Sequence, residues 1–106
     1  MNRTISSSEL QSMLGKPDLT ILDVRRSDDY TSDTSIIPGA AWHDPTQIEN
    51  WSKSLTADKE IVLYCVRGGA VSNSVVDALQ AKGLRVRYIE GGISAWKEAG
   101  GKVAAK

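Results

Sequence analysis

The chain has 106 residues, of which 13 are basic and 13 acidic, so its formal net charge at neutral pH is zero. This length is typical of one compact domain of ~100–150 residues, and the balanced charge argues against nucleic-acid or membrane-surface binding. Only one cysteine is present, which excludes an internal disulfide and a multi-cysteine zinc site.

The amino terminus lacks the apolar core of a signal peptide, and no apolar stretch approaches the ~18 residues that a membrane helix needs. Neither a repeat nor a low-complexity linker divides the chain. We therefore expect one soluble, cytoplasmic domain over residues 1–106, with no metal, cofactor, nucleic acid or membrane among its partners.

The first third of the chain predicts two helical segments around a strand. Ser6 and Glu9 form the pattern of a capping box, and apolar residues at helical spacing follow until Gly15. Residues 20–24 are β-rich and apolar enough for a buried strand. A short helical turn over 27–30 follows, for which Ser27 is the expected cap.

The remaining elements alternate between strand and helix. A turn at Pro38-Gly39 precedes a short strand over 40–42, and Asp44-Pro45 has the pattern of a helix start. Further segments are a strand over 61–64, a helix over 70–81, a strand over 86–89 and a last helix over 93–99. This alternation predicts an open, mostly parallel sheet with helices on both faces.

Cys65 ends the apolar run over 61–64 and enters the glycine loop over 66–69, which the helix over 70–81 follows. Ligands of such sheets bind beyond the carboxyl ends of the strands. Loop N–H groups and a helix amino terminus stabilise an anion there, so a thiolate nucleophile is the favoured interpretation. The alternative is a buried cysteine that fills a sheet-to-helix junction.

Several motifs, read in order, give the chain a family resemblance. They are Ile21-Leu22-Asp23-Val24-Arg25 with Tyr30, Ile37-Pro38-Gly39-Ala40, Tyr64-Cys65 with its glycine loop, and Glu90-Gly91-Gly92 with Trp96. Together they resemble a single-domain rhodanese from about Ser6 to Gly100. The resemblance implies an α/β fold with an open, mostly parallel five-stranded sheet and helices on both faces.

Rhodaneses are sulfurtransferases, so the resemblance implies that Cys65 takes sulfane sulfur from a donor such as thiosulfate. The resulting persulfide passes the sulfur to cyanide or a thiol, including the thiol of a protein. The active-site loop would comprise Cys65, Val66, Arg67, Gly68, Gly69 and Ala70, with Val71 opening the helix. Because the chain has no second cysteine, the acceptor must come from outside.

The sequence departs from the rhodanese pattern at three positions. Ile36 stands where a histidine is common, Val71 where an arginine often opens the loop helix, and Asp29 where thiosulfate-using members often have a basic residue. The last two departures remove positive charge that would help to hold a dianionic donor such as thiosulfate.

Two other functions remain to be separated from sulfur transfer. A cysteine phosphatase or arsenate reductase needs an arginine six residues after the cysteine, where this chain has Val71, and an isopropyl group cannot replace a guanidinium. A non-enzymatic module that binds a partner or senses oxidants through Cys65 is compatible with the same thiol.

Other candidate residues have plainer interpretations. Arg67 binds an oxyanion or is a solvated loop charge. His43, the only histidine, is expected to be a surface or capping residue rather than a base, and Asp23 with Arg25 a structural ion pair. Trp96 is expected to pack in the core, and Trp42 and Trp51 are likewise expected to be packing residues.

Overall fold

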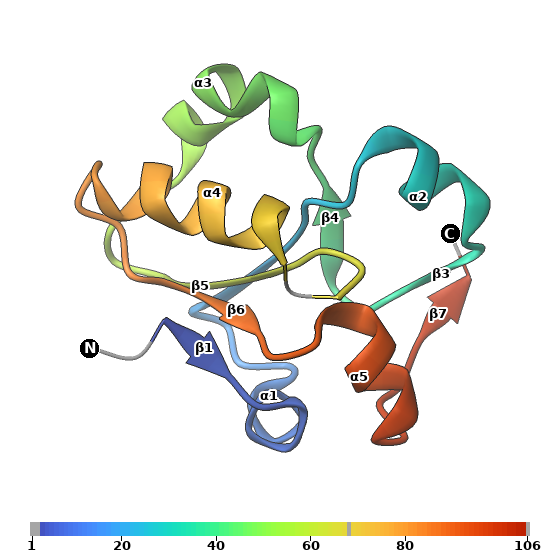
Figure 1. The fold of residues 1–106 in the computed structure, drawn as a ribbon. Helices are drawn as coiled ribbons and strands as arrows, with labels where there is room; N and C mark the ends of the chain where they lie inside the picture. Colours follow the sequence, from blue (N-terminus) through green and yellow to red (C-terminus); the bar gives the residue numbers. More distant parts are fainter. Residues whose placement is uncertain (1–2, 68, 106) are drawn as a thin grey trace.

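A computed structural model describes residues 3–67 and 69–105 (Figure 1). The helices are α1 (Ser7–Met13), α2 (Ser27–Ser32), α3 (Ile48–Trp51), α4 (Ala70–Gln80) and α5 (Gly92–Glu98), with 3-10 turns at Pro45–Gln47 and Ser52–Ser54. The strands are β1 (Thr4–Ile5), β2 (Leu19–Asp23), β3 (Ser35–Ile36), β4 (Ala40–Trp42), β5 (Glu60–Tyr64), β6 (Val86–Ile89) and β7 (Ala104–Ala105).

The main sheet has five strands in the order β1-β6-β5-β2-β4, and every pair within it is parallel. The predicted α/β fold with an open five-stranded sheet is therefore confirmed. Strand β1 and the antiparallel pair of β3 and β7 were not predicted, because each of these strands has two residues and so no periodic pattern. Within residues 3–67 and 69–105, no helix combines the length and apolar character needed to cross a membrane.

Helices cover both faces of the sheet, with α1 and α5 on one side and α3 and α4 on the other (Figure 1). Side chains of β5 alternate between two cores: Val62 and Tyr64 pack with Trp96 of α5, whereas Ile61 and Leu63 pack with helix α4. A strand buried on both faces is a near-continuous apolar run. This is why residues 61–64 could be assigned from the sequence.

Of the three predicted helix starts, those at Ser6 and Asp44 are confirmed and the one at Ser27 is wrong. Asp44 caps the 3-10 turn that follows it, where its carboxylate accepts from the Thr46 N–H at 2.9 Å. The N–H of Glu9 donates to Ser6 Oγ at 3.2 Å, and the Ser6 N–H donates to the Glu9 carboxylate at 3.4 Å, which completes the capping box. Ser27 is not the cap of α2 but its first residue; Arg26 precedes it without a side-chain cap bond. The main chain sets this boundary, because the Tyr30 N–H already donates to the carbonyl of Arg26.

The predicted packing of the tryptophans is confirmed. Trp96 is fully buried, and its indole N–H donates to the carbonyl of Lys102 at 2.7 Å. Trp42 is half-buried and stacks on Tyr30, with ring centroids 4.7 Å apart. Trp51 packs against the core beneath α4.

Candidate active site at the end of strand β5

Cys65 follows β5, the central strand of the sheet, and lies 6% exposed at the strand's carboxyl end. The chain then turns through Val66 and Arg67, whose side chain is exposed, and enters helix α4 at Ala70. Gly68, one of the predicted loop residues, lies outside the described residues. The cysteine thus occupies the strand-to-helix junction expected from its apolar run and glycine loop.

A cavity of about 370 Å³ opens at this junction, and we call it the Cys65 cavity. Five of the predicted loop residues line it together with Cys65: Val66, Arg67, Gly69, Ala70 and Val71. Two charged residues from the start of α2, Arg26 and Asp29, complete its wall. The position six residues after Cys65 is therefore an apolar wall residue, Val71, so the site lacks the guanidinium that a phosphatase would place there.

Arg26 was not among the predicted site residues. It comes three residues after β2 ends, and β2 is paired with β5 in parallel, so both chain segments leave the sheet at the same edge. Without the strand order, no pattern in the sequence links a residue after β2 to the thiol after β5.

Ser72 is the second residue that sequence reasoning missed. It lies in the first turn of α4, is fully buried, and its hydroxyl donates to Cys65 Sγ at 3.0 Å. A hydrogen bond to the charged form of a group favours that form. The Ser72 hydroxyl is thus placed to donate to negative charge on the sulfur of Cys65, beside the positive end of the α4 dipole.

The amino terminus of α5 holds the loop from the other side. The N–H of Ile93 donates to the carbonyl of Cys65 at 3.0 Å, and that of Ser94 to the carbonyl of Val66 at 3.1 Å. Gly92 permits this approach: its φ is +63°, and a Cβ there would lie 2.5 Å from both carbonyl oxygens. The Gly91-Gly92 break thus fixes the loop as well as beginning a helix.

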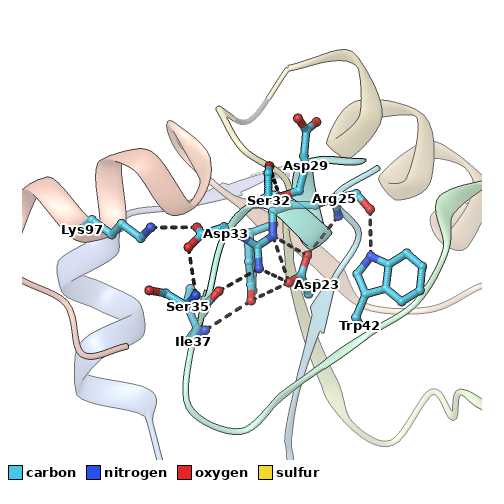
Figure 2. A network of polar contacts seen from close by, with 10 residues as sticks. Asp23, Arg25, Asp29, Ser32, Asp33, Ser35, Ile37, Trp42 and Lys97 are labelled. Carbon is cyan, nitrogen blue, oxygen red and sulfur yellow. Dashed lines mark hydrogen bonds and ion pairs between the residues drawn. The ribbon is translucent and has the colours of Figure 1, made fainter. Parts of the chain in front are cut away.

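A charged network lies beneath the same sheet edge, after β2 (Figure 2). Arg25 donates to Asp23 at 2.6 Å and to Asp33 at 2.9 Å, and Lys97 of α5 donates to Asp33 at 2.7 Å. The hydroxyl of Tyr64 donates at 3.1 Å to Asp23 Oδ2, the same carboxylate oxygen that accepts the 2.6 Å bond from Arg25. The predicted structural role of Asp23 and Arg25 is confirmed, because both are buried and paired with each other.

The network also fixes the charge states of its members. Partial burial acts to raise the pKa of Asp33, but hydrogen bonds from Lys97 and the Ser35 N–H, with the charges of Lys97 and Arg25, lower it to about 2. Burial raises the pKa of Tyr64, so its hydroxyl stays protonated and can donate to Asp23.

His43 is not part of the residues that line the Cys65 cavity. It was expected to be a surface or capping residue, but its half-buried ring instead lies against Trp51, with ring centroids 4.9 Å apart. Burial lowers the pKa of His43. It therefore packs as a neutral ring and does not reach the thiol as a base.

Comparison with known proteins supplies the family. A family profile for the Rhodanese-like domain matches residues 6–99. Thiosulfate sulfurtransferase GlpE of Coxiella burnetii is 30% identical over 98 residues, which cover 92% of this chain and 89% of that protein. A tRNA sulfurtransferase of Desulfurococcus amylolyticus is 33% identical over 91 residues, 86% of this chain, but the match spans only 17% of that longer protein.

Solved structures agree with the fold. A rhodanese-related protein from Thermoplasma volcanium superposes with a TM-score of 0.85 at 27% identity, covering 98% of this chain and 99% of that one. A thiosulfate sulfurtransferase from Pseudomonas aeruginosa gives a TM-score of 0.80 at 30% identity, covering 99% of this chain and 20% of that one.

Proposed function

The chain belongs to the rhodanese-like domain family, and on that premise we propose that it is a sulfurtransferase with Cys65 as its nucleophile. The observation that carries the proposal is the placement of the chain's one thiol. It faces an open cavity at the carboxyl end of β5, with the Ser72 hydroxyl donating to it at 3.0 Å. Relatives named as sulfurtransferases support the same chemistry.

In the first step the Cys65 thiolate attacks the outer sulfur of a donor such as thiosulfate. The Sγ–S bond forms, the donor's S–S bond breaks, and its electron pair leaves with sulfite. The product is a persulfide anion on Cys65. Ser72 and the α4 dipole stabilise negative charge on Sγ before this step, and the N–H groups of the loop are available to the outer sulfur after it.

In the second step an acceptor, cyanide or a thiolate, attacks the outer sulfur of the persulfide. The new bond to the acceptor forms as the Sγ–S bond breaks, and the electron pair returns to Cys65 as a thiolate. The only cysteine of the chain is Cys65 itself, so the acceptor is a separate molecule. Arg67 and Arg26, which line the Cys65 cavity, attract the anionic donor.

The test is turnover of thiosulfate and cyanide, followed as thiocyanate, together with the intact mass of the protein after exposure to donor. We expect thiocyanate formation and one added sulfur, and we expect Cys65→Ser to lose both while keeping the far-ultraviolet spectrum of the parent. Neither signal with any of several sulfur donors would favour a binding or redox-sensing module. Thiocyanate formation by Cys65→Ser would exclude Cys65 as the nucleophile.

A further inference from the structure

A second cavity adjoins the Cys65 cavity and lies along helix α4. It has a volume of about 490 Å³, its lining residues come from α4, the start of α2 and the segment that leads into α3, and we call it the α4 groove. Figure 1 shows where these elements lie in the fold. The groove and the Cys65 cavity share three lining residues, Arg26, Ala70 and Val71. The two cavities therefore adjoin each other, and a molecule that reacts at Cys65 has the groove beside it.

The groove is walled largely by apolar side chains. Val71, Val75 and Ala78 come from α4, and Pro45 and Ile48 come from the opposite segment. A dry apolar cavity of about 150 Å³ already accommodates benzene. The groove is therefore large enough for an aromatic ring or an alkyl chain, whereas an inorganic anion has nothing to bind on its apolar walls.

The charges around the two adjoining cavities do not favour a dianion. Two cationic side chains, Arg26 and Arg67, face three carboxylates, Asp28, Asp29 and Asp44. Hydrogen bonds from the main chain and side chain of Thr46 lower the pKa of Asp44, so this carboxylate is ionised at neutral pH. Each negative charge on a donor meets these carboxylates as well as the arginines, which disfavours a second negative charge.

We infer that the preferred sulfur donor is an organic compound with a single negative charge, whose charged sulfane end lies at Cys65 and whose apolar substituent lies in the α4 groove. This inference rests on the proposed sulfurtransferase function and specifies its substrate class. A thiosulfonate, R–SO₂–S⁻, has this chemistry. Thiosulfate would place both of its negative charges in the Cys65 cavity and leave the α4 groove empty.

The reaction balances in the same way as with thiosulfate. The Cys65 thiolate attacks the terminal sulfur of R–SO₂–S⁻, the Sγ–S bond forms, and the donor's S–S bond breaks. The electron pair leaves with the sulfinate R–SO₂⁻, and the persulfide anion remains on Cys65. Cyanide then removes the outer sulfur as thiocyanate, so one assay follows every donor.

The first experiment compares donors on the unaltered protein, with cyanide as the common acceptor. Benzenethiosulfonate and methanethiosulfonate share the reacting group and the charge and differ only in the substituent. Because an apolar pocket discriminates by about tenfold or more between substituents of different size, we expect kcat/KM for benzenethiosulfonate to exceed that for methanethiosulfonate by at least this factor. Equal values would overturn the inference.

A second experiment fills the groove. Ala78→Phe places a ring on the groove wall, whereas Ala81→Phe places the same ring at the exposed end of α4, away from both cavities. We expect Ala78→Phe to lower the benzenethiosulfonate to methanethiosulfonate ratio by about tenfold, and Ala81→Phe to leave the ratio unchanged. A ratio that Ala78→Phe does not lower would overturn the inference.

Failure of this inference is distinguishable from failure of the proposed function. If thiosulfate and both thiosulfonates are turned over at similar kcat/KM, the sulfurtransferase function stands, but the α4 groove does not bind the substituent of the donor. Absence of thiocyanate and of the persulfide adduct with all three donors would exclude the sulfurtransferase, and the substrate class with it.

Discussion

The ends of strands β2 and β5 lie side by side, with Asp23 in register with Tyr64, yet the two segments that follow are built differently. After β2, Asp23 and Arg25 are buried and joined to Asp33 and Lys97 by short ion pairs. After β5, a loop with a single charged side chain, Arg67, holds one thiol, through main-chain bonds to α5 and one bond from Ser72.

The segment after β2 supports the fold, whereas the segment after β5 carries the proposed chemistry. Charges in the network are matched by partners within the protein, so they are costly to remove and have little capacity left for a substrate. The loop uses main-chain groups for support, so its side chains and its sulfur face an open cavity. We therefore expect substitutions in the network to affect stability first, and substitutions in the loop to affect activity first.

The largest effect is expected from Arg25→Met. It leaves the Asp23 carboxylate buried without its guanidinium partner, which costs about 3–5 kcal/mol of unfolding free energy. Urea unfolding measures this loss. The matched control is Arg3→Met, which breaks the exposed pair of Arg3 with Asp77 and should cost less than about 1 kcal/mol. Similar losses for the two variants would contradict the comparison.

Gly92→Ala tests the main-chain support of the loop. Its Cβ would meet the carbonyl oxygens of Cys65 and Val66 at 2.5 Å, and its φ is +63°. We expect a loss of about 3 kcal/mol in unfolding free energy, with reduced kcat because the loop is displaced.

Gly83→Ala is the control for Gly92→Ala, since Gly83 also has positive φ (+82°) but open space around its Cβ position. We expect Gly83→Ala to lose about 1 kcal/mol of unfolding free energy, from backbone strain alone, and to keep the kcat of the parent. A Gly92→Ala variant with the kcat of the parent would show that the contact with α5 does not position the loop.

The pH dependence of stability tests the ion pairs that Asp33 forms in the network. The pKa of Asp33 is lowered from 3.8 to about 2 in the folded protein, so it binds protons more weakly when folded than when unfolded. Its contribution, about 2 kcal/mol, is present above pH 4 and lost as the pH falls toward 2. The difference in unfolding free energy between the parent and Asp33→Asn should therefore shrink over this window, as acid titration of urea unfolding would show. A difference independent of pH would contradict the pairing with Lys97 and Arg25.

The smallest effect in free energy is expected from Ser72→Ala. Loss of its hydrogen bond to Cys65 Sγ should slow both alkylation by iodoacetamide and sulfur transfer by about tenfold. The control is Ser52→Ala, a second buried serine whose hydroxyl has no hydrogen-bond partner among the described residues. Ser52→Ala should leave both rates unchanged, and an unchanged alkylation rate in Ser72→Ala would remove Ser72 from the site.

The elements that the sequence predicted are those with their own local pattern. Residues 61–64 form an apolar run, residues 70–81 have one apolar helical face, and the lone cysteine stands between them; all three predictions match the structure. Ser72 has no such pattern: a serine in the first turn of a helix is common, and only the turn of the loop brings its hydroxyl to the sulfur.

The sequence by itself determined the class of fold and the position of the thiol, because both follow from periodicity and from neighbours within a few residues. Tertiary structure alone decided what surrounds that thiol. Arg26 reaches the site because β2 pairs with β5, and Ser94 reaches it because α5 packs beside the loop. The α4 groove exists because segments far apart in the chain face each other. Contacts between residues far apart in the chain depend on strand order and helix packing, which no local pattern encodes.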